Sequence, residues 1–144
     1  MKAGYLLDTS AVVALLKGTP PPVRRRFRKA IKKEAPFGVS SVVLHELWHG
    51  VARSGRAQEN AERLKVFLSA PVRVVPFEAE DAAEAGRLRA ELEAAGASLG
   101  PYDVLIAAQA LRLGATLVTA DAHTFERVRG LAWKDWGRKG SGRE

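Results

Sequence analysis

Residues 5–11, YLLDTSA, place an apolar run directly before one aspartate and two hydroxyl residues. This pattern predicts a short buried strand and then a helix over about 10–17, which Thr9 or Ser10 would cap. A carboxylate so close to a core needs a cation, a hydrogen-bond donor or a metal as its partner. Ligands of open α/β sheets bind outside the carboxyl ends of the strands, so Asp8 is a candidate site residue. A helix cap or a buried ion pair would explain Asp8 equally well.

Apolar and polar segments alternate along the rest of the chain. Further strands are predicted at 36–40, 72–76, 115–119 and 131–136, and helices at 22–33, 41–54, 58–68, 78–95, 101–113 and 123–128. Such alternation predicts an α/β fold, with a mostly parallel central sheet of about 4–5 strands and helices on both faces. We expect a single domain over residues 1–136 and a flexible basic tail over residues 137–144.

The composition narrows the class of protein. The chain has 144 residues, a formal net charge of +7 and a pI of about 10.1, which suits a polyanionic partner such as nucleic acid. It has no cysteine, which excludes a disulfide framework and a thiolate zinc site. The apolar run near the N-terminus is interrupted by Asp8, and no apolar window has the length of a membrane span. We therefore expect a cytoplasmic protein without a signal peptide or a membrane segment.

One predicted helix, residues 22–33, is strongly basic. Its apolar side chains fall on one face, and the remaining positions carry Arg24, Arg25, Arg26, Arg28, Lys29, Lys32 and Lys33. No acid interrupts this run before Glu34, so repulsion within the helix is unrelieved. We expect RNA phosphate contacts from part of this face, at Arg24, Arg25, Arg28, Lys29 and Lys32. A solvated basic face is the alternative.

Four of the 16 acidic residues are flanked by apolar sequence: Asp8, Glu46, Asp103 and Asp121. The others are expected on solvated helix faces or helix starts, at positions such as Glu59, Glu62, Glu78, Glu80, Asp81, Glu84, Glu91 and Glu93. Four carboxylates that converge cannot all ionise without a cation, because each raises the pKa of the others. Oxygen ligands without Cys or His are what Mg²⁺ or Mn²⁺ prefers. An acidic metal site on a basic protein suits metal-assisted cleavage of a phosphodiester.

The sequence around these acids resembles the PIN-domain ribonucleases, and closely the VapC-type toxins of toxin–antitoxin pairs. The matching stretches are residues 5–10, 40–50, 100–108 and 117–121, with Phe125, Gly130-Leu131 and Asp135-Trp136. The resemblance implies a PIN-like fold in which Asp8 and Asp103 bind the metal directly. It implies that Glu46 and Asp121 hold a second metal or its water shell, or act as the base. The hydroxyl residues Thr9, Ser10 and Thr119 would orient these groups.

The resemblance also implies a cofactor and partners. The metal would be Mg²⁺, with Mn²⁺ as the alternative, and one ion or two would bind. The substrate would be a structured RNA such as a transfer RNA loop, whose bases are unstacked. The protein would form a homodimer, and a cognate antitoxin would cover the site with its C-terminal segment. The chain departs from near relatives at Ala120-Asp121, where they often carry Asn-Asn.

Residues 45–49, HELWH, match the H-E-x-x-H signature of zinc metalloproteases. The longer form of that signature is missing, because no third histidine follows at the required position. The apolar residues of this helix also define a face other than that of His45 and His49, so we expect a surface or RNA-facing pair. A non-catalytic RNA-binding module is a further alternative, but it leaves the four acids unexplained.

Overall fold

A computed structural model describes residues 4–69, 71–121 and 123–138 of the chain. Its five strands form one sheet in the order β3-β2-β1-β4-β5. The strands are β1 (Tyr5–Leu7), β2 (Phe37–Ser40), β3 (Val72–Val75), β4 (Thr116–Thr119) and β5 (Trp133–Asp135). Every neighbouring pair is parallel, which confirms the predicted sheet.

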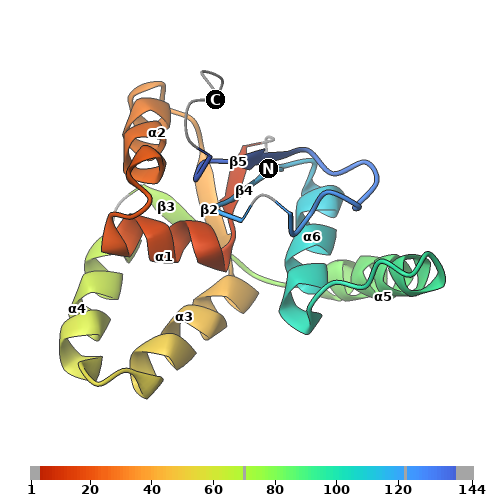
Figure 1. Ribbon diagram of the computed structural model, residues 1–144, viewed down its shortest axis with the longest axis horizontal. Coiled ribbons are helices and arrows are strands. Elements are labelled where there is room, and N and C mark those ends of the chain that lie inside the picture. Colours follow the sequence, from red (N-terminus) through yellow and green to blue (C-terminus); the bar gives the residue numbers. More distant parts are fainter. Residues whose placement is uncertain (1–3, 70, 122, 139–144) are drawn as a thin grey trace.

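The part of the chain that the structure describes contains six helices: α1 (Thr9–Lys17), α2 (Pro21–Lys32), α3 (Ser41–Arg53), α4 (Ala57–Leu68), α5 (Ala79–Ala94) and α6 (Pro101–Leu113). From β1 to β3 the chain steps along the sheet in one direction, and from β3 to β4 it crosses back past β1. Because parallel crossovers are right-handed, the first four helices and the last two must lie on opposite faces. Figure 1 shows this division, with α5 and α6 on the side away from α1, α2 and α4.

The reversal of strand order places a crevice outside the carboxyl ends of β1 and β4. These strands pair directly, with Leu7 opposite Val118. Asp8 follows the end of β1, and Asp121 lies two residues beyond the end of β4. Such a switch point is where open α/β sheets bind ligands, so the topology brings two of the predicted acids to one crevice.

The cap of α1 lies one or two residues before the predicted position. Asp8, not Thr9 or Ser10, is the N-cap of α1, and its side chain accepts from the backbone N–H of Ala11. Ser40 caps α3, its side chain accepting from the N–H of Val42. An aspartate caps at least as well as a hydroxyl, and the earlier cap leaves Thr9 and Ser10 in the first turn of the helix with their hydroxyls available for other bonds.

The C-terminal part differs from the sequence-based expectation in one element. Residues 123–128, predicted as a short helix, form turns in which the N–H of Val128 donates to the carbonyl of Phe125. Phe125 is buried, so this segment is anchored by its side chain and not by helical hydrogen bonds. Of the predicted tail, Gly137 donates its N–H to Asp135 Oδ1 at 2.8 Å, and residues 139–144 lie outside the described residues.

No helix in the described ranges combines the length and the apolar character needed to cross a bilayer. The interior is a single cluster of aliphatic and aromatic side chains around the sheet. Its aromatic part joins Tyr5 and Phe37, whose rings are 5.2 Å apart, at the amino ends of β1 and β2. The aromatic packing therefore lies at the end of these strands opposite to Asp8.

Candidate active site

Asp8 is a buried carboxylate held by its own helix. It is only 4% exposed, and its Oδ1 accepts from Ala11 N and from Ser10 Oγ, both at 2.8 Å. Burial, and to a lesser degree the nearby charge of Asp103, raises the pKa of Asp8 to about 6 against the opposing effect of hydrogen bonds from Thr119, Ala11 and Ser10. No Lys or Arg among the described residues pairs with Asp8. The protein therefore holds a carboxylate in a place that disfavours its charge.

Ser10 ties the start of α1 to the end of β4. Besides donating to Asp8, its Oγ accepts from Ala120 N at 2.9 Å and lies 3.1 Å from Thr119 Oγ1. Thr119 Oγ1 in turn accepts from the N–H of Asp121 at 3.0 Å. These bonds fix the loop that carries Asp121 relative to Asp8. Thr119 is itself fully buried, so this connection is shielded from water.

Glu46 approaches the same edge from α3. It is half-buried, and its Oε1 accepts from Thr9 Oγ1 at 2.6 Å. Val43, three residues before Glu46, and Leu47, which follows it, are buried and anchor α3 against the core. As the sequence predicts, Glu46 lies toward the inward side of its helix, and Thr9 fixes its direction.

Asp103 lies in the first turn of α6, just after Pro101. Burial raises the pKa of Asp103, and the charges of Glu46 and Asp121 raise it further. The charge of Asp103 in turn raises the pKa of Asp8. The four acids therefore lie at one edge of the sheet, close enough for Asp103 to interact electrostatically with each of the other three. Within residues 4–69, 71–121 and 123–138, however, no three His, Asp or Glu side chains are spaced to hold a metal ion as they stand. The acids are gathered, but they do not form a preassembled ligand set.

The donor set at this edge suits a hard divalent cation. It consists of carboxylate oxygens with hydroxyl oxygens beside them, which are the ligands of Mg²⁺ and Mn²⁺. Burial, together with the charges of neighbouring acids, raises the pKa values of Asp8 and Asp103 and so disfavours their ionised forms. A bound cation would reverse this effect by favouring the ionised carboxylates.

The histidines of the HELWH segment lie on the surface. Both His45 and His49 are exposed, and their rings lie nearly parallel with centroids 6.4 Å apart. This confirms the expected surface pair. A zincin helix would instead turn the two imidazoles toward a cleft with a third ligand.

One acid expected on a solvated helix face or at a helix start lies at a helix start and is buried. Asp81 is 0% exposed, accepts from the N–H of Glu78 at 2.7 Å and forms an ion pair with Arg112. Its position at the start of α5 is as expected, but its burial was not predicted, because Arg112, 31 positions later in the sequence, reaches it across the α5–α6 contact. Its surroundings in sequence, near the start of α5, contain no sign of that partner.

The basic helix α2 lies away from the acidic edge. Arg24 donates to the carbonyls of Leu15 and Leu16, so it caps the end of α1. Arg26, expected on the solvated basic face, is only 3% exposed and donates to the carbonyls of Trp136 and Arg138. The nine residues of α1 span about 13 Å, which separates the start of α2 from the acids.

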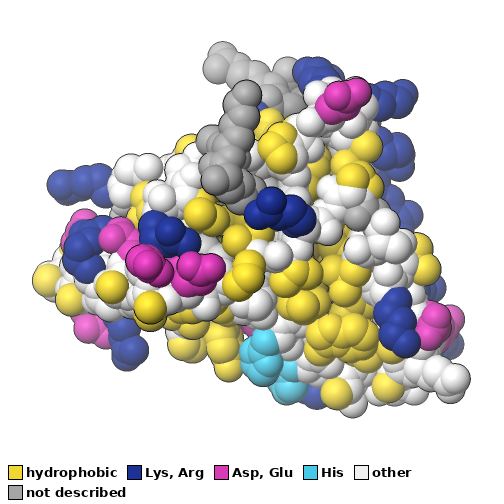
Figure 2. All heavy atoms as spheres, turned by 180° about the vertical axis from the view of Figure 1, so that it is seen from behind, with side chains coloured by type: hydrophobic (Ala, Val, Ile, Leu, Met, Phe, Trp, Pro, Cys, Tyr) yellow, Lys and Arg dark blue, Asp and Glu magenta, His cyan; other side chains and the backbone are white. Residues whose placement is uncertain are grey.

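The other predicted phosphate contacts on α2 remain at the surface. Arg25, Arg28, Lys29 and Lys32 are exposed. Figure 2 shows basic side chains along the margin of the molecule where α2 lies. These residues can meet an extended polyanion, but they do not border the carboxylates.

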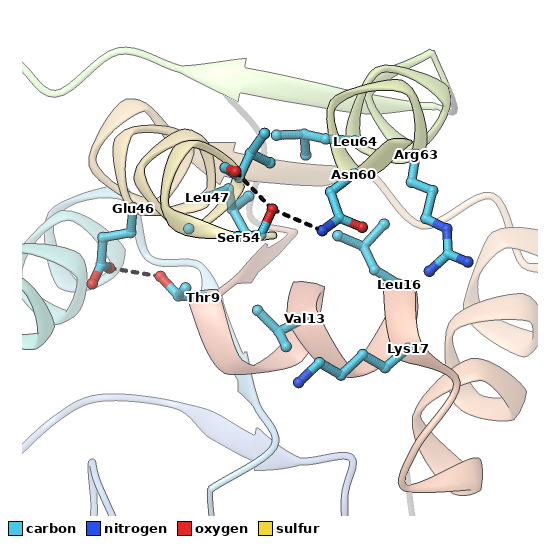
Figure 3. A pocket seen from close by; sticks show the side chains of 12 residues that line it. Thr9, Val13, Leu16, Lys17, Glu46, Leu47, Ser54, Asn60, Arg63 and Leu64 are labelled. Carbon is cyan, nitrogen blue, oxygen red and sulfur yellow. Dashed lines mark hydrogen bonds between the residues drawn. The ribbon is translucent and has the colours of Figure 1, made fainter. Parts of the chain in front are cut away.

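A pocket of about 390 Å³ extends from the acidic edge between α1, α3 and α4. Thr9 and Glu46 lie at one end, and Lys17 and Arg63 lie at the other (Figure 3). Its middle is lined by apolar side chains, among them Val13, Leu16, Leu47 and Leu64. The sequence indicated Thr9 and Glu46, but the cationic end depends on how α1 and α4 pack and has no local signature.

Comparison with known proteins assigns the family. A model of the PIN domain matches residues 5–131. The tRNA(fMet)-specific endonuclease VapC of Shigella flexneri is 35% identical over 132 residues, which make up 92% of this chain and 97% of that protein. The structure of VapBC2 from Rickettsia felis, bound to a DNA fragment from its promoter, matches with a TM-score of 0.84 at 33% identity, covering 92% of this chain and 98% of that one.

A more distant solved structure has the same fold. VapBC-5 from Mycobacterium tuberculosis, a member of the VapBC family of toxin–antitoxin systems, matches with a TM-score of 0.65 at 26% identity and covers 92% of this chain and 97% of that one. The similarity in fold and in sequence extends over nearly the whole chain. The chain therefore belongs to the PIN-domain family and, within that family, to the VapC-type ribonucleases.

Proposed function

We propose that this chain is a metal-dependent endoribonuclease and the toxin of a toxin–antitoxin pair. The observation that carries the proposal is the convergence of Asp8, Glu46, Asp103 and Asp121 on one crevice, where the pKa values of Asp8 and Asp103 are raised. The similarity to an endonuclease over 92% of the chain supports the same reading.

In this proposal Asp8 and Asp103 hold Mg²⁺ or Mn²⁺, while Glu46 and Asp121 hold a second ion or its water shell, or act as the base. When bound, such an ion activates water at neutral pH and stabilises the charge that develops on the phosphate. Ser10, through its bond to Asp8, and Thr119, through its bond to Asp121 N, fix the direction of these groups.

The proposed substrate is a structured RNA, with transfer RNA as the first class to test. The relative from Shigella flexneri is specific for tRNA(fMet), and the net charge of +7 favours a polyanion. In this proposal the exposed cations of α2 contact the RNA backbone away from the bond that is cut. A compact folded RNA is large enough to meet both surfaces at once.

The proposed protein partners are a second copy of this chain and a cognate antitoxin. Support for the antitoxin comes from the similarity to VapBC complexes. The pocket between α1, α3 and α4 would receive the covering segment, because it runs from Glu46 to the cations Lys17 and Arg63. An antitoxin segment there would reach the acids and block the crevice.

The test is cleavage of purified transfer RNAs by the antitoxin-free protein with Mg²⁺ or Mn²⁺. We expect cleavage that stops with EDTA and stops in Asp8→Asn, although that variant still binds RNA. The matched control is Asp81→Asn, which changes an equally buried aspartate away from the crevice. Binding of RNA without cleavage under any metal condition would indicate a non-catalytic RNA-binding module and overturn the proposal.

A further inference from the structure

Three ring side chains form an exposed row beside the acidic edge. The ring centroids of Tyr102 and His45 are 5.7 Å apart, and those of His45 and His49 are 6.4 Å apart. All three side chains are exposed, and Tyr102, with 43% of its surface open to solvent, is one of the large apolar side chains that the fold leaves uncovered. Figure 2 shows histidine side chains on the outside of the molecule, bordered by apolar ones.

Two residues of the row are sequence neighbours of two of the four acids. Tyr102 directly precedes Asp103 on α6, and His45 directly precedes Glu46 on α3. Neighbours on a helix point about 100° apart, so each helix turns its carboxylate toward the crevice and the adjacent ring toward its rim. The contact between Tyr102 and His45 therefore joins α3 and α6 on the outer side of the acids.

No structural task in the described part of the chain accounts for these rings. Neither the Tyr102 hydroxyl nor an imidazole nitrogen of His45 or His49 forms a hydrogen bond or an ion pair there. The rings do not fill the core, and among the described residues no third metal ligand stands with the two imidazoles. Exposed aromatic surface next to a cleft indicates a binding surface.

The chemistry of the row fits a nucleobase. Proteins that recognise single-stranded RNA stack unpaired bases on Tyr, Phe, Trp or His rings, whereas the bases of an A-form duplex are already stacked on each other. A ring at the rim of the crevice can hold a base while the adjoining phosphodiester reaches the carboxylates. A duplex offers no free base face to this row.

We propose that Tyr102, together with His45 and His49, is a stacking platform for unpaired bases next to the bond that is cut, so that the protein selects single-stranded loops over duplex RNA. This proposal rests on the ribonuclease function proposed above. It adds the residues that would recognise the unpaired bases of the loop. Tyr102 and His45 take the base nearest the carboxylates, and His49 takes the next base outward.

The test uses an RNA hairpin with 2-aminopurine in its loop and the Asp8→Asn protein, which binds without cutting. We expect the 2-aminopurine fluorescence to be quenched on binding, and Tyr102→Ala to weaken binding by roughly tenfold. Tyr102→Phe keeps the ring and should stay within about twofold of the parent. His45→Ala should weaken binding less than Tyr102→Ala. A fully paired RNA of the same length should bind equally to all variants.

The matched control is Val74→Ala on the edge strand β3, because Val74 is 42% exposed and lies outside the row. Unchanged loop binding in both Tyr102→Ala and His45→Ala would overturn the platform. So would equal losses in Tyr102→Phe and Tyr102→Ala, since the hydroxyl and not the ring face would then matter. A change of oligomeric state in Tyr102→Ala with unchanged RNA binding would assign the row to a protein interface and also overturn it.

Failure of the underlying function is distinguishable from failure of the platform. If the wild-type protein cuts no RNA in Mn²⁺, the ribonuclease function itself is wrong. If the wild-type protein cuts loops and Tyr102→Ala cuts them equally well, only the platform is wrong.

Discussion

Asp8 and Asp81 are both buried aspartates at the start of a helix, yet their surroundings are opposite. Asp81 caps α5 together with Glu78 and is neutralised by Arg112. Asp8 caps α1, but the charges around it are those of other acids, and burial raises its pKa to about 6. Burial of a carboxylate does not by itself mark a functional site. Burial without a cation, among further carboxylates, does mark one, because at neutral pH the fold then carries a cost that a bound cation removes.

The largest expected effect separates the two aspartates by activity. Asp8→Asn removes a proposed metal ligand, and loss of several kcal/mol of transition-state stabilisation lowers kcat at least roughly a hundredfold. Asp81→Asn should keep the rate within about threefold at a temperature where the protein is folded, because it lies outside the crevice. Single-turnover cleavage of transfer RNA in Mn²⁺ measures both. Equal losses of cleavage rate in the two variants would show that Asp8 has no catalytic role that Asp81 lacks.

The second-largest effect concerns the contribution of the Asp81 ion pair to the stability of the fold. Arg112→Ala leaves the carboxylate of Asp81 buried and unpaired, which should lower the free energy of unfolding by about 3 kcal/mol. The melting temperature should fall by roughly 6–12 °C, as measured by circular dichroism. The control is Arg89→Ala, which removes only the exposed pair with Glu93 and should cost less than about 1 kcal/mol. A melting temperature of Arg112→Ala equal to that of the control would show that Asp81 needs no cation.

A third effect concerns the pH dependence of stability without metal. Because the pKa of Asp8 is raised in the folded state, its unfavourable contribution is absent below the unfolded value of 3.8 and grows until the pH exceeds about 6. Wild-type protein in EDTA should therefore lose up to about 3 kcal/mol relative to Asp8→Asn between pH 4 and pH 7.

Thermal melts of both proteins across this pH range measure that difference. Addition of Mn²⁺ at pH 7 should restore the lost stability of the wild type and leave the stability of Asp8→Asn unchanged. Asp103 contributes with the same sign in both proteins, so its effect cancels in the comparison apart from its interaction with Asp8. If the melting temperatures of the two proteins changed with pH in parallel, the charge of Asp8 would already be neutralised within the protein, as the charge of Asp81 is.

The smallest expected effect concerns the hydroxyl between α1 and β4. Ser10→Ala removes one bond to Asp8 and leaves the N–H of Ala120 without its acceptor. We expect a loss of about 1 kcal/mol of stability and a fall in cleavage of roughly fivefold. Ser69→Ala, at the exposed end of α4, is the matched control, because its hydroxyl donates to the carbonyl of Val66 and lies outside the crevice. A Ser10→Ala enzyme as active as this control would show that Asp8 needs no orienting hydroxyl.

The sequence was sufficient for features that depend on local pattern. Alternation of strands and helices predicted the parallel sheet, and the apolar flanks of Asp8, Glu46, Asp103 and Asp121 selected the acids that the topology brings together. Both signals are local because a strand, a helix and a buried position each leave a periodic trace over a few residues.

Features that depend on distant partners were not predictable from the sequence. Asp81 looks like an ordinary acid in the first turn of a helix, since Arg112 is far away in the chain. Arg26 looks like one more cation on a basic helix, although its guanidinium caps carbonyls after β5. Residues 123–128 have helical composition, but burial of Phe125 sets their path.

The central claim is that the carboxylates around Asp8 gather to bind a divalent cation. Titration of metal-free protein with Mn²⁺ at pH 7.5, followed by electron paramagnetic resonance of the free ion, tests it without RNA or antitoxin. We predict binding by the wild type and by Asp81→Asn, and at least tenfold weaker binding by Asp8→Asn and by Asp103→Asn. Equal Mn²⁺ affinity in wild type, Asp8→Asn and Asp103→Asn would contradict the claim.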